Sequence, residues 1–558
     1  MVLATKRLAA LTSLLLIVLP GATAHGATVD VSTNPLLTIT GAAQPNGLGD
    51  VNGDGVADIG VMASDFSAAY VVFGRLTRGT VDVNALGSHG FKITPAAPDH
   101  LSNGGGVPRI TAAGDVNGDG RGDVLVAAPL ADFNGRTDSG SAYVVFGRTG
   151  TTTVDLGALG SGGFRVDGPM ERPGDILKQG PIAAAGDVGG DSRDDVIVGF
   201  RRALPPHGGP DEPGTSFVIY GGASGAIDTG APLGTRGFTI AHSGGAVAGL
   251  RDFNGDGRND VALASAFARD GHVVFGLSPP ADRDVDALGS GGFTISDDVT
   301  LGGTPYSYSV GWTLDGGGDV NGDGRPDLAM GNNQSVCFTL CLLPRRAAVL
   351  FAGPSTANVN VGSIGSRGFA IDNGSGSTLA GTATMAGDVN ADVRADILVG
   401  RLRGGPVLVY GKAGTDTVNL DRLGDAGVDL TGADAGEPDL HFDGVGDQDG
   451  DLIADVAVED DPSNRVYVVN LLPGAAQQLA IIAFRVAGFG LREPLSGQLI
   501  SRLTATRNDV TNNQTRAACL RLGEFTQFVA SRNGNGLNGP QPFELVASAG
   551  RVSRTLGC

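Results

Sequence analysis

Seven stretches of the sequence carry aspartate and asparagine at a fixed spacing, and such a pattern could bind a metal ion. The second stretch, from Gly114, reads GDVNGDGRGD, and the others begin at Gly49, Gly186, Arg251, Gly318, Gly387 and Gly446. We count each loop from its leading aspartate, so the best copies have Asp at position 1, Asn at 3, Asp at 5, Gly at 6 and Asp at 9. Side-chain oxygens at positions 1, 3, 5 and 9 and the backbone carbonyl at 7 are hard ligands, which favours Ca²⁺ over Zn²⁺.

Units 1, 2, 4 and 5 carry the complete ligand set, and the other three depart from it. The complete loops are Asp50, Asn52, Asp54, Val56 and Asp58; Asp115, Asn117, Asp119, Arg121 and Asp123; Asp252, Asn254, Asp256, Arg258 and Asp260; and Asp319, Asn321, Asp323, Arg325 and Asp327. Unit 6 has Asp388, Asn390, Asp392, Arg394 and Asp396 with Val393 at the turn, and unit 7 has Asp447, Asp449, Asp451, Ile453 and Asp455 with Leu452 there. Unit 3 keeps Asp187, Asp191, Arg193 and Asp195 but has Gly189 at position 3 and Ser192 at position 6. We therefore expect up to seven calcium ions, with unit 3 binding most weakly.

Three other interpretations of these loops are weaker. An EF-hand requires a bidentate Glu at position 12, whereas that position is Val, Leu or Met in all seven copies. A phosphate-binding loop requires a Lys-Ser/Thr ending and a following helix, which the stretch from Gly114 lacks. The adhesion triplet Arg121-Gly122-Asp123 overlaps ligand positions 7 and 9, so its aspartate is expected to be committed to the metal. Asx-turns without metal remain the alternative, above all for unit 3.

The elements around the loops repeat as well. The leading aspartates recur about every 65 residues, and positions 10 and 12 are always apolar, which predicts a strand after each loop. A second strand ends in an aromatic residue, as in YVVFG from Tyr70, and a third element reads GFKI from Gly90 or a close variant. With the strand before the loop, each unit has four expected strands, and seven units predict an all-β, seven-bladed β-propeller.

With its Phe-Gly pairs at 73–74, 146–147 and 275–276, the chain resembles the FG-GAP repeat family, the seven-bladed propellers of integrin α subunits and of many secreted bacterial proteins. The resemblance covers about residues 36 to 488. It implies that an N-terminal strand at 36–40 closes the ring in the last blade, although AFRV from Ala483 is an alternative closing strand. It also implies a recognition or adhesion function.

The two ends of the chain differ from the repeats. Residues 1–24 have Lys6 and Arg7, an apolar run and a small-residue end, the layout of a secretory signal peptide cleaved after Ala24 or Ala27. The alternative, a membrane anchor, needs a run of about 20 apolar residues. No later segment suits a membrane span, so we expect a secreted protein with the propeller at 28–488. Helical spacing of apolar residues then predicts a small helical module at 489–558.

The four cysteines fall as two pairs, Cys337 with Cys341 and Cys519 with Cys558. In an oxidising compartment two bridges within those pairs are the simplest of three connectivities, and free thiols are the alternative. The formal charge of −20 disfavours a nucleic-acid partner.

Integrin partners dock on the propeller face opposite the calcium loops, and the resemblance places two long variable segments there. They carry Arg201, Arg202, His207, Arg345 and Arg346. We expect these residues to bind an extracellular protein or glycan, unless the segments are merely solvated insertions. An extracellular hydrolase or lyase with its site on this same face is the alternative, although the sequence contains neither HExxH nor GxSxG and its histidines are dispersed.

Overall fold

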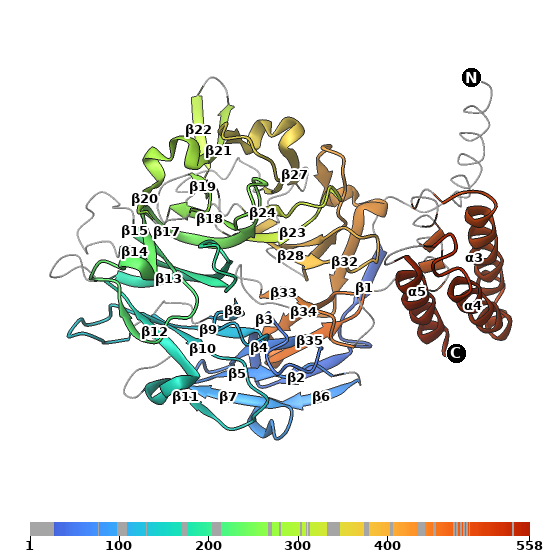
Figure 1. Ribbon diagram of the computed structural model, residues 1–558, viewed down its shortest axis with the longest axis horizontal. Helices are drawn as coiled ribbons and strands as arrows, with labels where there is room; N and C mark the ends of the chain where they lie inside the picture. The colour runs from blue at the N-terminus through green and yellow to red at the C-terminus, as the bar shows by residue number, and fades with distance from the viewer. Residues whose placement is uncertain are drawn as a thin grey trace.

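The computed structural model describes residues 27–558 apart from 76–77, 97–108, 130, 170–176, 203–213, 266–269, 278–280, 302–303, 309, 311–312, 332–345, 373–378, 402–404, 434–440, 450–452, 538–540 and several positions between 472 and 490. Its strands form blade-like sheets around a common axis, and its helices lie together to one side (Figure 1). The protein is therefore an all-β propeller with an appended helical module.

The first sheet shows the plan of a blade. Strands β3 (Ala42–Gly49), β4 (Asp58–Ala63), β5 (Ala69–Val72) and β7 (Gly90–Thr94) are antiparallel neighbours, and β3 is innermost. The acidic loop of unit 1 joins β3 to β4. A fifth strand, β11 (Val154–Asp155), comes from the next unit and pairs parallel with β7.

Four further sheets of five strands repeat this order, each from the innermost strand outward. They are β8 (Ile110–Gly114), β9 (Asp123–Ala128), β10 (Ser141–Val145), β12 (Gly163–Asp167) and β16 (Gly225–Asp228); β23 (Thr313–Gly318), β24 (Asp327–Gly331), β25 (Ala347–Leu350), β27 (Gly368–Asp372) and β31 (Val418–Asn419); β28 (Leu379–Gly387), β29 (Asp396–Arg401), β30 (Val407–Val409), β32 (Gly427–Thr431) and β1 (Ala27–Asp30); and β33 (Phe442–Gly446), β34 (Asp455–Asp460), β35 (Arg465–Val469), β2 (Leu37–Thr40) and β6 (Gly79–Asp82).

The remaining sheet has ten strands and contains the strand order of a blade twice. Its strands are β13 (Leu177–Gly186), β14 (Asp195–Arg202), β15 (Gly214–Ile219), β17 (Gly237–Arg251), β18 (Asp260–Ser265), β19 (Gly271–Val274), β21 (Gly292–Leu301) and β22 (Thr304–Tyr308), with β20 (Arg283–Asp284) parallel to β17 and β26 (Val359–Asn360) parallel to β21. The long strand β17 pairs with β15 through residues 237–243 and with β18 through 244–251. Its first part is thus the fourth strand of the half that begins with β13, and its second part is the innermost strand of the half that continues with β18.

The innermost strands lie side by side in a closed ring, in the order β3, β8, β13, β17, β23, β28, β33 and back to β3. Hydrophobic clusters fill the space between neighbouring sheets. In β4, for example, Met62 packs toward the second sheet, whereas Ile59 and Val61 pack toward the sheet of β33. Because both faces of a blade are buried, its strands are runs of apolar residues such as DVLVAAP, without polar alternation.

The N-terminal strand expected at 36–40 closes the ring, and a second N-terminal strand that was not expected precedes it. Strand β2 pairs antiparallel with β35 in the last sheet, and β1 pairs parallel with β32 in the sheet before it. The parallel fifth strand of each blade was not part of the four-strand expectation. Its signal in the sequence is a second repeat, TVDVNALG from Thr80 and TVDLGALG from Thr153, in which the aspartate caps a short 3₁₀ turn.

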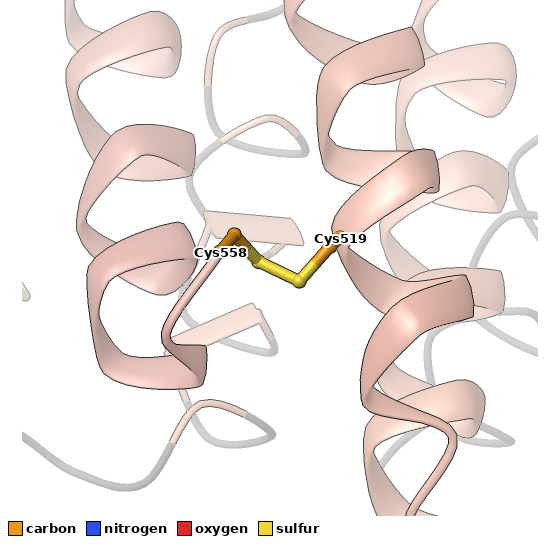
Figure 2. The surroundings of a disulfide bond; sticks show 2 residues. All are labelled: Cys519 and Cys558. Carbon is orange, nitrogen blue, oxygen red and sulfur yellow. A yellow bond between two sulfur atoms is a disulfide. The ribbon is translucent and has the colours of Figure 1, made fainter.

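The helical module contains α3 (Leu495–Thr511), α4 (Thr515–Ala530) and α5 (Gln541–Leu556). Its core also includes Ala475, Leu479, Ile482, Ala483 and Val486. The boundary expected at 488 is therefore too late, because residues from 475 onward bury their apolar side chains against the helices. Ala483 and Val486 belong to this helical core, so the segment AFRV from Ala483 is not the strand that closes the ring. A disulfide joins Cys519 to Cys558 (Figure 2), whereas Cys337 and Cys341 lie outside the described residues.

Candidate metal centres

In the six acidic loops whose turn is described, the leading aspartate organises a tight turn. In unit 2, Asp115 Oδ1 accepts hydrogen bonds from the backbone N–H groups of Gly118 (2.8 Å) and Asp119 (2.9 Å), and Oδ2 accepts one from Gly120 (2.8 Å). Gly118 and Gly120 have φ values of +77° and +85°. Glycine is favoured at positions 4 and 6 because this left-handed conformation is unfavourable for residues with a Cβ atom.

The aspartate at position 9 is fully buried and joins the loop to its blade. Asp123 Oδ2 accepts hydrogen bonds from Val116 N (2.9 Å) and Asn117 N (3.2 Å), and Oδ1 accepts one from Gly147 N (2.8 Å). Burial raises the pKa of Asp123 to about 6, although these hydrogen bonds act in the opposite direction. The Arg-Gly-Asp triplet is thus closed to a receptor, because its carboxylate is fully buried.

The same contact explains the Phe-Gly pair at the end of the third strand. Gly147 N donates to Asp123, and a Cβ atom on Gly147 would lie 2.6 Å from the Gly122 carbonyl oxygen and 2.8 Å from that of Val51. No side chain fits at that distance, so unit 2 requires glycine here. In unit 5 the same position is Ala352, whose N–H still donates to Asp327 Oδ1 (2.9 Å).

The side chains at positions 3 and 5 complete an oxygen-rich cluster. Asn117 Nδ2 donates to Asp119 Oδ2 (3.3 Å), and the equivalent bond occurs in units 1, 4, 5 and 6. In unit 7, carboxylate oxygens of Asp447, Asp449 and Asp455 all lie within 4.8 Å of one another, and Asp451 lies outside the described residues. A donor set of carboxylate and amide oxygens fits Ca²⁺. The residues at positions 1, 3, 5, 7 and 9 would hold it.

The loops of units 3 and 6 keep the backbone shape of the complete loops. Ser192 at position 6 of unit 3 has φ +67°, and in unit 6 Ala391 and Val393 have φ +66° and +75°. Asp187 accepts hydrogen bonds from Gly190, Asp191 and Ser192 just as Asp115 does from its own loop. The missing glycines therefore cause local strain rather than a different loop.

Neighbouring loops are linked around the ring. The N–H at position 8 donates to the position 1 carbonyl of the preceding loop, as from Gly122 to Asp50 (2.8 Å), and six such bonds are present. In the remaining loop, that of unit 5, position 8 is Pro326, which has no N–H to donate. Arg121 also reaches the preceding loop, since a Cβ on Gly53 would lie 3.0 Å from its Nε.

The expected ligand-binding residues are only partly described. Arg201 and Arg202 end β14, which starts at position 9 of its loop, so they lie at the far end of the blade. Arg346 precedes β25 at that end and forms an ion pair with the buried Asp297 (Nη1 to Oδ1, 3.6 Å). His207 and Arg345 lie outside the described residues.

A second group of acids near the axis was missed from the sequence. Asp315 and Asp443 each lie four residues before a leading aspartate, on innermost strands β23 and β33. Asp443 Oδ2 accepts a hydrogen bond from Gly47 N (3.0 Å), and Asp315 Oδ2 accepts one from Met385 N (2.7 Å), so each carboxyl reaches the next inner strand. Burial raises the pKa of Asp315 to about 6 and that of Asp443 to about 8. The signal in the sequence that could have identified these two acids is a polar residue within a strand that precedes an acidic loop.

Comparison with known proteins gives one family match and several partial sequence matches. The FG-GAP repeat model matches residues 107–145 and 310–338, so the chain carries FG-GAP repeats within a β-propeller. The chain is 27% identical over 185 residues to the mouse phosphatidylinositol-glycan-specific phospholipase D and 28% identical over 164 residues to integrin alpha-PS2 of Drosophila melanogaster.

These matches are partial. The phospholipase match covers 32% of this chain and 21% of the phospholipase. The integrin match covers 26% of this chain and 11% of the integrin. Among solved structures, BBS1N in complex with ARL6DN aligns over 80% of this chain and 93% of that chain, with 11% identity and a TM-score of 0.38. Within the described residues, no helix has both the length and the apolar character needed to cross a bilayer.

Proposed function

We propose that this protein is a secreted, calcium-stabilised, seven-bladed β-propeller that recognises an extracellular protein or carbohydrate. The observation that carries the proposal is the acidic loop, which recurs seven times in the sequence. In the six loops whose turn is described, backbone N–H groups donate to the position 1 carboxylate. In all seven loops, at least one backbone N–H of the loop donates to the buried aspartate at position 9. We count the ten-stranded sheet as two blades, because β17 repeats the blade order on each side and seven innermost strands close the ring. The proposal that the protein is secreted is based on residues 1–24, which have the layout of a signal peptide.

Calcium would neutralise carboxylates that otherwise repel one another at each loop. A ligand that binds only the folded state stabilises it by about 1.4 kcal/mol per site at tenfold excess over its dissociation constant. We expect chelation to lower the melting temperature strongly, and calcium but not magnesium to restore it. Differential scanning calorimetry on protein passed over a chelating resin tests this. An unchanged melting temperature after calcium removal would refute calcium stabilisation.

Recognition is proposed for the face opposite the loops, where Arg201 and Arg202 end β14. A glycan and matrix-protein array probed with the purified protein tests it. We expect a bound ligand whose signal falls when both arginines become alanine, and an unchanged signal for the control Arg516→Ala in α4. If the double variant binds as the unaltered protein does, the ligand uses another surface.

A hydrolase or lyase is the second candidate, favoured by the carboxyl pair Asp315 and Asp443. Asp315 Oδ2 accepts a hydrogen bond from Met385 N and Asp443 Oδ1 accepts one from Thr384 Oγ1, so both carboxyls lie against β28, and burial raises the pKa of each. Two such carboxyls can hold one proton between them and so provide a general acid and a general base. The phospholipase match makes phosphatidylinositol-glycan substrates the first to assay. Turnover that Asp443→Asn abolishes in a protein of unchanged melting temperature would support the enzyme, and absence of turnover across hydrolase and lyase substrates would exclude it.

A further inference from the structure

The third acidic loop lacks a side chain at position 3 and has Ser192 in place of glycine at position 6, but it keeps its three aspartates and their hydrogen bonds. Asp191 N donates to Asp187 Oδ1 (2.9 Å), Arg193 N to Asp191 Oδ1 (3.0 Å), and Gly189 N and Gly221 N to the buried Asp195 (3.0 and 2.8 Å). Three carboxylates are therefore held as in the complete loops. What is missing is one neutral oxygen, the amide that Asn supplies elsewhere.

A tyrosine side chain lies where that amide is missing. A Cβ atom on Gly189 would lie 3.3 Å from both Cε1 and Cζ of Tyr220. Cζ is the carbon that carries the hydroxyl, so the polar end of the ring is directed at position 3. Tyr220 ends the third strand of unit 3, at the place of the phenylalanine in the Phe-Gly pair.

The packing of this ring does not require a hydroxyl. Tyr220 contacts Phe238 edge to face, with ring centroids 6.2 Å apart and an angle of 67°. In units 1, 2, 4 and 5 phenylalanine makes the same contact, with centroids 6.0 to 6.3 Å apart. Those four units have Asn at position 3. Phenylalanine would therefore satisfy the packing in unit 3 as well.

The hydroxyl oxygen of Tyr220 is buried and has no hydrogen-bond partner among the described residues. Burying an unpartnered polar group is costly, so such a group indicates a role outside the packing. Besides burial, the charges of Asp195, Asp191 and Asp187 help to raise the pKa of Tyr220 to about 12. The hydroxyl thus lies within the electrostatic reach of the three candidate ligands.

We propose that the Tyr220 hydroxyl replaces the missing position 3 amide as the neutral oxygen ligand of the third calcium site. The inference rests on the proposed calcium binding and revises the expectation that unit 3 binds most weakly. A phenolic oxygen is a hard, neutral donor, so the site keeps three carboxylates and one neutral side-chain oxygen, as in the complete loops.

Unit 6 provides an internal control. Tyr410 occupies the same place at the end of its third strand, but Asn390 is present at position 3. Asn390 Nδ2 lies 3.4 Å from both Asp392 Oδ2 and Asp396 Oδ1, so the usual side chain is in position there. The hydroxyl of Tyr410 should be dispensable for calcium.

The test measures calcium protection loop by loop. Hydrogen–deuterium exchange of the full chain, followed by mass spectrometry across a calcium titration, reports peptides 187–195, 115–123 and 388–396 separately. We expect Tyr220→Phe to raise the calcium concentration that half-protects 187–195 at least about tenfold. The other two peptides should not change, and Tyr410→Phe should leave all three unchanged. The double variant Gly189→Asn/Tyr220→Phe, which recreates the complete loops, should restore the protection of 187–195.

Two outcomes would overturn the inference while leaving calcium binding intact. One is an identical titration of 187–195 in the unaltered protein and in Tyr220→Phe. The other is a lack of calcium protection at 187–195 in the unaltered protein while 115–123 is protected. If 115–123 is itself unprotected at any calcium concentration, the proposed calcium function fails, and this inference with it.

Discussion

Val393 is held in a left-handed conformation by the loop around it. Its φ is +75°, its side chain is 64% exposed, and its N–H donates to Asp388 Oδ2 (2.8 Å), as a glycine does in the complete loops. A β-branched residue has nothing to gain from packing at this exposed position. The strain is therefore retained only because the loop's hydrogen bonds specify the turn.

Val393→Gly should stabilise the protein by about 1 kcal/mol, because glycine adopts this conformation without a Cβ clash. Val393→Ala is the matched control, since it shortens the side chain but keeps the Cβ atom. Urea unfolding of the calcium-free protein measures both. Equal effects of the two substitutions would show that the backbone is not the source of the strain.

Glu459 is a buried acid whose ionisation opposes folding. It is 4% exposed, and its Oε2 accepts a hydrogen bond from Gln44 N (2.8 Å), yet burial raises its pKa from 4.5 to about 7. Since the folded-state pKa is the higher one, its favourable contribution is complete below pH 4.5 and is lost as the pH rises through 7.

Glu459→Gln keeps an acceptor oxygen but cannot ionise. We expect its stability relative to the unaltered protein to increase between pH 5 and pH 8, by on the order of 2–3 kcal/mol. Melting temperatures at the two pH values measure this. The exposed Glu524→Gln in α4 is the control and should show no such pH dependence. A gain of equal size at both pH values would contradict the role of ionisation.

The loop and its blade act as one element through the aspartate at position 9. Asp123 holds three backbone N–H groups, from two loop residues and from Gly147 in the third strand. Asp119 at position 5 accepts only one backbone N–H, from Arg121 (3.0 Å), and is exposed. The two aspartates therefore differ in their structural role, although both are candidate ligands.

Asp123→Ala should destabilise the calcium-free protein by at least about 3 kcal/mol, because three donors lose their acceptor. Asp119→Ala should cost under about 1 kcal/mol without calcium. Both variants should lose the stabilisation that calcium gives this loop. Unfolding with and without calcium separates the two effects, and equal losses in calcium-free protein would disprove the structural role of position 9.

At the scale of the whole molecule, the N-terminal strand β2 holds the ring closed. Strand β2 contributes Leu37 and Ile39 to the core between the last sheet and the first, and β1 lies on the edge of the sheet before. Without β2, strand β35 would present an unpaired edge next to an emptied core, which favours aggregation.

A chain that starts at residue 35 should melt at a lower temperature but still cooperatively, because it lacks only β1. A chain that starts at residue 41 should lose cooperative unfolding and aggregate. The reference is a chain that starts at residue 27. Calorimetry and size-exclusion chromatography distinguish the three, and a cooperative, monomeric chain without β2 would show that the ring does not depend on this closure.

The sequence by itself determined the repeat, the candidate ligands and the class of fold. Asp, Asn and Gly at fixed positions encode the loop because the hydrogen bonds within it join residues only two to seven positions apart. Apolar runs after each loop encode buried strands for a similarly local reason. The helical spacing from Leu499 to Leu556 likewise predicted α3 to α5, and the Cys519–Cys558 bridge was the simplest pairing.

Only the tertiary structure decided which distant residues meet. The fifth strand of each blade, the pairing of Asp315 and Asp443 with neighbouring inner strands, and the placement of Tyr220 over Gly189 depend on contacts between separate strands or separate units. The helical module begins near 475 rather than 489 because its core recruits those residues. Such contacts are set by how sheets pack around the axis, and no local pattern in the chain specifies that packing.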